Sequence, residues 1–208
     1  ARVQKIRHRA STSFPLISGD NFASLADFSF VANMNYKHLV AEISKSKIFF
    51  CESNLIHDFL NHFAHVSNNS ILIVGNGDQD YFDSDIFPQN FSKVLLQNSF
   101  ISDNDRIFTL PIGIENLRIG VNGIPSRFES NNPRNQELRT LLIGPFGDTN
   151  SERSQLDGID DLPGINIIKP PNRVSPHKYP TLLKEATWLA CARGNGIDTH
   201  RVWEALYF

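Results

Sequence analysis

Short apolar runs alternate with longer, helix-compatible segments along most of the chain, and this alternation limits the folds that are open to it. The clearest run, Ile71–Val74, is followed at once by the turn Gly75-Asn-Gly-Asp78. Apolar residues at helical spacing, from Leu55 to Phe63, precede it. Runs of similar length lie at 47–52, 93–96, 106–110, 140–143 and 165–168. Strands that alternate with helices form parallel sheets, so the sequence predicts an α/β fold.

The intervals between these runs predict further helices and one domain boundary. Asp20 is expected to cap a helix that continues to about Phe30, and a second helix is expected from Tyr36 to Ser44. Residues 116–137 are rich in Gly, Asn and Pro, as linkers are. We therefore place one Rossmann-like domain at 1–130 and the beginning of another at 131–208. The sequence lacks an initiator Met and stops inside a predicted helix, so we expect a piece of a longer protein.

The segment 187–208 predicts a strand, a glycine turn and a helix in that order. Thr187 to Ala192 is an apolar run of strand length. Arg193-Gly194-Asn195-Gly196 supplies residues that tolerate the positive φ angles of a tight turn. Asp198 is a favourable N-cap for the helix, whose apolar face is expected at Val202, Ala205 and Leu206.

The helix carries charged residues next to this turn. His200 and Arg201 lie four and three residues before Glu204, so the three side chains share one face. With Arg193 and the amides of the helix N-terminus, they predict a phosphate-binding site. The alternative is an ordinary turn with a surface Arg–Glu pair.

The run Arg193-Gly-Asn-Gly-Ile-Asp-Thr-His-Arg-Val-Trp-Glu-Ala-Leu-Tyr207 resembles the donor-site segment of exostosin-like glycosyltransferases and related bacterial enzymes. Pro111-Ile-Gly-Ile-Glu115 is similar to the segment that ends the first domain of such enzymes. Ala192 stands where the family usually has Pro. The resemblance is strong over 180–208, moderate over 106–180 and faint before that. It implies a GT-B enzyme, in which two Rossmann-like domains enclose a cleft.

In that family the turn and helix hold the diphosphate of a nucleotide sugar, and the helix glutamate holds the ribose. The resemblance therefore assigns donor binding to Arg193, Gly194, Asn195, Gly196, Asp198, Thr199, His200, Arg201 and Glu204. It implies an inverting transfer of a hexosyl or pentosyl group to a hydroxyl of a glycan or another acceptor. The arginines would neutralise the leaving diphosphate, so no metal and no further cofactor is expected.

The acceptor hydroxyl needs a base, and the first domain offers acidic residues after two apolar runs. Asp78, with Asp80 beside it, follows the run at 71–74, and Asp20 follows the short run Phe14–Ser18. Ligands of α/β folds bind at the carboxyl ends of strands, so either carboxylate is a candidate base. A solvated turn for Asp78 and a helix cap for Asp20 are the alternatives.

Two other functions stay open. The loop Gly75–Asp80 is similar to half of the cofactor motif of S-adenosylmethionine-dependent methyltransferases, although Gln79 stands where a third glycine is expected. The second alternative is a non-catalytic module, which would bind partners or form a homodimer through an exposed Leu206-Tyr-Phe208.

Composition excludes some classes of protein. The net charge of −2 provides no basic surface for nucleic acid. No apolar run approaches the roughly 20 residues that a membrane-spanning helix needs. Cys51 and Cys191 end separate apolar runs and predict buried thiols, which favours a reducing, cytoplasmic location. The seven histidines show no metal-ligand spacing.

Overall fold

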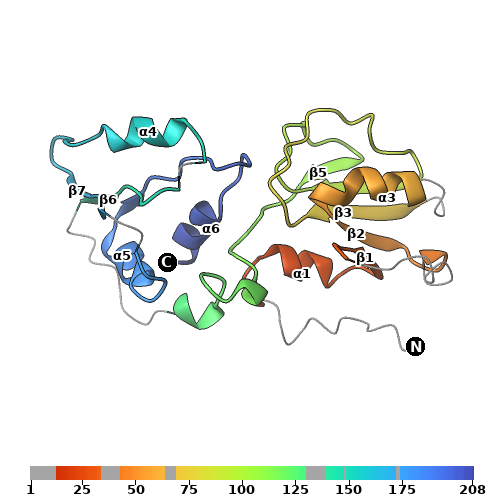
Figure 1. The fold of residues 1–208 in the computed structure, drawn as a ribbon, viewed down its shortest axis with the longest axis horizontal. Helices are drawn as coiled ribbons and strands as arrows, with labels where there is room; N and C mark the ends of the chain where they lie inside the picture. Colours follow the sequence, from red (N-terminus) through yellow and green to blue (C-terminus); the bar gives the residue numbers. More distant parts are fainter. Residues whose placement is uncertain (1–12, 34–42, 64–68, 130–138, 148, 172–173) are drawn as a thin grey trace.

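The computed structural model describes residues 13–33, 43–63, 69–129, 139–147, 149–171 and 174–208. They form two lobes, each built on its own parallel sheet, which lie side by side (Figure 1). The chain leaves the first lobe through two short 3-10 helices, η3 (Leu117–Ile119) and η4 (Pro125–Arg127). The predicted boundary at residue 130 falls in the range 130–138, which lies outside the described residues.

The first lobe contains a five-stranded parallel sheet whose strands follow one another in sequence order. The strands are β1 (Phe28–Phe30), β2 (Ile48–Glu52), β3 (Ser70–Gly75), β4 (Phe91–Leu96) and β5 (Ile107–Thr109). The helical segments are α1 (Gly19–Ala23), η2 (Ser53–Leu55) and α3 (Ile56–Phe63), of which α3 lies across one face of the sheet (Figure 1). The predicted α/β class is therefore confirmed.

Phenylalanine rings fill the space between this sheet and α3. Phe49, Phe59 and Phe91 are fully buried. The centroid of the Phe49 ring lies 6.0 Å from that of Phe59 and 6.2 Å from that of Phe91. Such pairs add about 0.5–1.5 kcal/mol to the stabilisation from buried area. The periodic apolar residues of α3 thus form the core of the first lobe.

The second lobe is smaller and holds a three-stranded parallel sheet in the order β7-β6-β8. Its elements are β6 (Thr140–Leu142), α4 (Glu152–Asp157), β7 (Asn166–Ile168), α5 (Tyr179–Glu185), β8 (Trp188–Leu189) and α6 (His200–Tyr207). Leu142, Leu183 and Ala186 form its buried apolar cluster. Because the strands are parallel, the segments that follow β6 and β8 meet at one edge of the sheet.

The prediction of a helix from Asp20 to Phe30 is wrong. Helix α1 ends at Ala23, and Phe28–Phe30 form β1. The N-cap is Ser18, whose hydroxyl accepts a hydrogen bond from the amide of Asn21 at 3.4 Å, so Asp20 lies inside the first turn. Alternate residues of β1 are buried in the sheet, a two-residue period that the helical interpretation overlooked. The predicted helix from Tyr36 to Ser44 lies largely outside the described residues.

Helix α6 also differs from its predicted apolar face. It buries Glu204, which is 4% exposed, and leaves Leu206 71% exposed. Tyr207 and Phe208 pack against Phe128, with ring centroids 6.0 and 5.1 Å apart. The hydroxyl of Tyr207 also accepts a hydrogen bond from the amide of Ile17 in the first lobe at 2.8 Å. Of the three residues that were expected to form a dimer surface, Tyr207 and Phe208 are thus partly buried within the chain, and Leu206 stays exposed.

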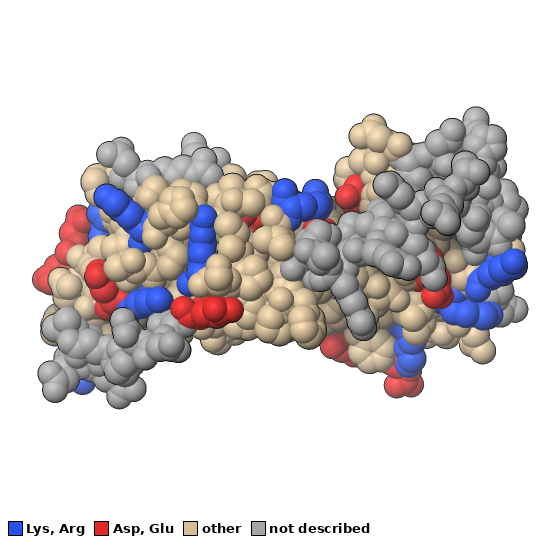
Figure 2. Space-filling model, turned by 90° about the horizontal axis from the view of Figure 1, so that it is seen from below, with Lys and Arg blue, Asp and Glu red and all other residues tan. Residues whose placement is uncertain are grey.

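The surface carries both signs of charge. Figure 2 shows lysine and arginine side chains interspersed with aspartate and glutamate on the visible face. Cys51 and Cys191 are free thiols; Cys51 is buried, as predicted, whereas Cys191 is only partly buried, so the prediction for Cys191 is wrong. In the ranges that the structure describes, no helix has the length and apolar character to cross a membrane.

Truncating the central core ring tests this packing. Phe59→Ala should lower the free energy of unfolding by about 3–5 kcal/mol, because the cavity it leaves is enclosed by the sheet and α3. Urea unfolding measures the change. Phe82→Ala is the matched control, since its ring is 71% exposed, and it should change the stability far less. Equal losses for the two variants would contradict the assignment of the core.

Candidate functional site

A cavity of about 320 Å³ lies at the edge of the second sheet, where the segments that follow β6 and β8 meet the first lobe. Most of the residues that the sequence assigned to a site line it. They are Asp78, Gly194, Asn195, Gly196, Asp198, Thr199, His200, Arg201 and Glu204. Asp20 and Arg193 are not among the lining residues. The carboxyl edge of a parallel sheet is where α/β folds place ligands.

The turn before α6 is shaped by a close approach rather than by positive φ. None of the residues Arg193–Gly196 has a positive φ, so that prediction is wrong. A Cβ on Gly196 would lie 2.6 Å from the side-chain amide of Asn98, which follows β4. That amide donates to the carbonyl oxygen of Gly77 at 3.0 Å and accepts from the amide of Asp198 at 3.1 Å. The glycine is therefore needed to let the two lobes touch.

Asp198 joins the first lobe to the beginning of α6. Its carboxylate accepts hydrogen bonds from the amide of Ile112 at 2.9 Å and the amide of Thr199 at 2.8 Å. It also accepts from the indole nitrogen of Trp203, at 2.8 Å for the nearer oxygen. The N-cap of α6 is Thr199, not Asp198 as predicted. The carboxylate thus fixes the helix from outside its first turn.

Two guanidinium groups flank the ring of Phe146 in this cavity. The central carbon of Arg201 lies 4.7 Å from the ring centroid, and that of Arg153, from α4, lies 5.5 Å from it. Arg201 donates to the carbonyl oxygen of Pro145 at 2.8 Å. Arg153 donates to the carbonyl oxygens of Arg193 at 2.9 Å and of Gly147 at 2.8 Å. Both side chains are held in place by neutral groups.

Glu204 lies within electrostatic range of Arg201, but it makes no direct ion pair with that guanidinium. Neither Arg153 nor Arg201 forms an ion pair with a described carboxylate. Nη1 of Arg201 and Oγ1 of Thr199 are buried without a hydrogen-bond partner there. Burial, together with the charge of Arg201, lowers the pKa of Arg153. Two cations and a helix N-terminus around one cavity provide a site for an anion.

Glu204 lies on the same cavity but is almost fully buried. Burial raises the pKa of its carboxyl group, and the nearby His200 and Arg201 oppose that rise. Tyr179 from α5 lies beside it, and burial followed by the Glu204 charge raises the pKa of the tyrosine. A buried acceptor next to a cavity is suited to bind hydroxyl groups of a ligand.

The loop 75–80 uses its carboxylates to hold the turn of the second lobe. Arg193 forms an ion pair with Asp80 at 3.0 Å, and its guanidinium lies 5.7 Å from the centroid of Phe100. The side-chain amide of Asn195 donates to Asp78 at 2.9 Å. The predicted phosphate ligand Arg193 is therefore paired with an acidic residue beside the cavity.

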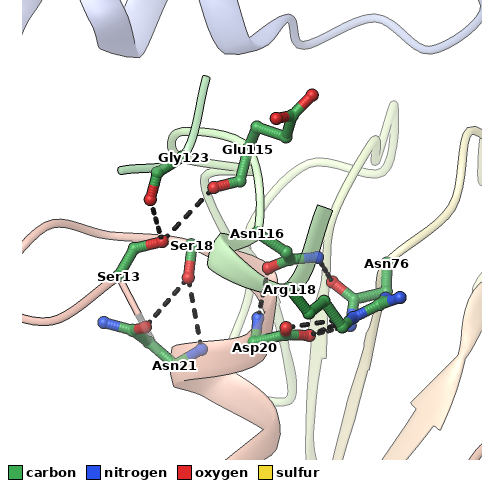
Figure 3. Close-up of polar contacts among 9 residues, drawn as sticks. All are labelled: Ser13, Ser18, Asp20, Asn21, Asn76, Glu115, Asn116, Arg118 and Gly123. Carbon is green, nitrogen blue, oxygen red and sulfur yellow. Dashed lines mark hydrogen bonds and ion pairs between the residues drawn. The ribbon is translucent and has the colours of Figure 1, made fainter. Parts of the chain in front are cut away.

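Asp20 lies apart from the cavity in a polar network (Figure 3). It is 6% exposed, and Nε of Arg118 approaches its two carboxylate oxygens at 3.2 and 3.0 Å. Asn76 donates to the same carboxylate at 3.0 Å, and the amide of Asp20 donates to Asn116 at 2.7 Å. The network ties α1 to the loop after β3 and to η3, which is a structural role.

Sequence reasoning missed Arg153, Phe146, Tyr179 and Asn98, all of which shape the site. Phe146 and Arg153 follow β6, which pairs with β8. A rule that adjacent parallel strands release their loops at one edge would have pointed to both. Asn98 lies two residues after the end of β4, where the same rule applies. Nothing in the local pattern singles out Tyr179.

Comparisons with known proteins add no relationship: no protein-family model matches the chain, and no curated protein matches it. In the residues that the structure covers, no group of three or more His, Cys, Asp or Glu side chains is arranged to hold a metal ion.

A side chain on Gly196 should separate the lobes. Gly196→Ala would displace the Asn98 amide and break its two hydrogen bonds, at a cost of about 1–3 kcal/mol. Thermal unfolding measures the loss. Gly158→Ala is the matched control, because the nearest atom to its Cβ would be a carbonyl oxygen at 3.7 Å. A Gly196→Ala protein as stable as this control would contradict the contact.

Glu204 should make stability depend on pH. Because burial raises its pKa, the folded protein keeps this proton to higher pH than the unfolded chain does. Its contribution to stability is complete below the ordinary carboxyl pKa and is lost as the pH rises through the folded-state pKa. Glu204→Gln removes this titration, so the free energy of unfolding should fall less steeply with rising pH. Urea unfolding at pH values from below the ordinary carboxyl pKa to above the folded-state pKa measures how the free energy of unfolding changes with pH. Exposed Glu185→Gln is the control.

Proposed function

We propose that the protein is a glycosyltransferase that moves a sugar from a nucleotide-sugar donor to an acceptor hydroxyl. In this proposal the two lobes are the facing parts of a GT-B enzyme, and the cavity is the donor site. The observation that carries it is the pair Arg153 and Arg201, which share the Phe146 ring without forming an ion pair with a described carboxylate. A diphosphate is a ligand that would contact both guanidinium groups directly.

The first support is the position of the cations relative to α6. Arg201 belongs to the first turn of α6, and Thr199 at its N-cap makes no side-chain capping bond. The buried Nη1 of Arg201 and Oγ1 of Thr199 lack partners among the described residues. Phosphate oxygens accept hydrogen bonds from guanidinium, hydroxyl and backbone amide groups at such a place.

The second support is the location of Glu204, one turn further along α6. Ribose hydroxyls that donate to its carboxylate would offset the cost of keeping that charge buried. The diphosphate would lie at the beginning of the helix and the nucleoside toward its second turn. This order of charges matches a nucleoside diphosphate better than a single phosphate group.

The cations also suit the transfer step itself. Negative charge grows on the diphosphate as the bond to the sugar breaks, and fixed guanidinium groups stabilise that charge without rearranging. We assign this role to Arg153 and Arg201. The resemblance proposed Arg193 for this role as well. Its carbonyl oxygen instead accepts a hydrogen bond from Arg153, and its guanidinium pairs with Asp80.

The methyltransferase alternative gains no support from the loop 75–80. A Cβ on Gly77 would lie 2.0 Å from the hydroxyl oxygen of Ser53, so this glycine serves internal packing. Asp78 and Asp80 bind the turn of the second lobe. Other parts of the protein therefore contact this loop at the place where a cofactor would need to approach its backbone.

Calorimetric titration with UDP and GDP tests the donor site. Arg153→Ala and Arg201→Ala should each weaken binding about tenfold or more, because a charged hydrogen bond contributes about 1.5–3 kcal/mol. Arg201→Lys should recover part of the loss. The control is Arg139→Ala, which removes an exposed guanidinium outside the cavity.

The proposal fails if the wild-type protein binds neither nucleotide, or if the two cavity variants bind as the control does. Arg193→Ala distinguishes the two assignments of the cations. It should weaken binding less than Arg153→Ala if the cavity geometry is decisive. Titration with S-adenosylmethionine should give no signal.

A further inference from the structure

His200 combines exposure to solvent with a ring nitrogen that is able to accept a proton, and it lines the donor cavity. It is the first residue of α6, and its Nδ1 lies 2.7 Å from the carbonyl oxygen of Gly113. A carbonyl oxygen only accepts hydrogen bonds, so Nδ1 carries the proton. The neutral ring then presents Nε2 as a base.

We propose that His200 is the general base of the transfer, an inference that rests on the proposed function. The acceptor hydroxyl attacks the anomeric carbon, and its proton passes to Nε2. The bond from that carbon to the diphosphate oxygen breaks, and the electron pair leaves on the diphosphate beside Arg153 and Arg201. The imidazolium then releases the proton to solvent, because the side chain is exposed.

The carboxylates around the cavity are engaged in other contacts. Asp198 accepts from three N–H groups, those of Ile112, Thr199 and Trp203. Asp78 accepts from Asn195 and thereby holds the turn. Glu204 is buried, so an acceptor hydroxyl reaches it less easily than the exposed imidazole. Asp20, the other predicted base, is ion-paired outside the cavity.

Charged groups from several segments lie around the cavity that His200 lines. Glu204 lies within electrostatic range of His200, and Arg201 is the next residue along α6. Further described charges are those of Asp198 before α6, Glu115 after Gly113 and Asp78 across the cavity.

Two amide variants separate the possible roles of the ring. The side-chain nitrogen of His200→Asn takes the place of Nδ1 and keeps the bond to Gly113, but the variant has no base. His200→Gln places an amide near Nε2.

The assay follows nucleotide release from UDP-glucose, UDP-galactose, UDP-N-acetylglucosamine and GDP-mannose, with glycerol and cellobiose as acceptors. Both variants should lower the turnover about a hundredfold or more, while UDP affinity stays at the wild-type value.

The pH profile adds a readout that a purely structural role would not change. The wild-type rate should fall toward acidic pH as the imidazole is protonated, and this limb should be absent in His200→Asn. The inference is overturned if His200→Asn weakens UDP binding and His200→Gln restores it, since His200 would then be a phosphate ligand. It is also overturned if Asp78→Asn, and not His200→Asn, removes the limb.

The remaining outcomes are separable from failure of the proposed function. A wild-type protein that binds UDP or GDP but releases no nucleotide from any of these donors would overturn the catalytic role and leave the donor site standing. Absence of any nucleotide binding would overturn both. Imidazole nitrogen NMR gives an independent check, since the neutral ring should carry its proton on Nδ1, and a proton on Nε2 would contradict the base.

Discussion

The carboxylate of Asp198 is the contact on which the geometry of the cavity depends. It binds the backbone after β5 through Ile112 and the beginning of α6 through Thr199 and Trp203. Since His200, Arg201 and Glu204 all project from that helix, this group helps to set their positions relative to the first lobe, together with the contacts of Tyr207 with Ile17 and of His200 with Gly113. A charged acceptor with several N–H donors is well suited to this task, because such hydrogen bonds are stronger than neutral ones.

The distribution of charge follows from the same arrangement. Acidic side chains of the first lobe are committed to polar partners: Asp20 to Arg118, Asp80 to Arg193 and Asp78 to Asn195. Arg153 and Arg201 instead rest on carbonyl oxygens and an aromatic ring. These contacts fix the guanidiniums in direction without neutralising them, which leaves their charge available to a ligand.

Much of the fold was predictable because its strands are continuous apolar runs, as strands buried on both faces of a parallel sheet are. The predicted runs at 47–52 and 93–96 correspond to β2 and β4. β1 was missed because three residues are too few to establish a period against the helical signal before it. At the site, the cluster on α6 follows from helical spacing alone. Arg153 and Asn98 do not, since the tertiary pairing of strands distant in sequence brings Arg153 to the cavity and Asn98 to the turn beside it.

The modest apolar cluster of the second lobe has a consequence for how the protein responds to its ligand. Leu142, Leu183 and Ala186 bury little area compared with the phenylalanine core of the first lobe. The second lobe is thus the region expected to open at the lower free energy. A molecule that bridges α4 and α6 would raise that opening energy by mass action. Ligand occupancy and local order would then rise together, and the unliganded protein would fluctuate most around the cavity.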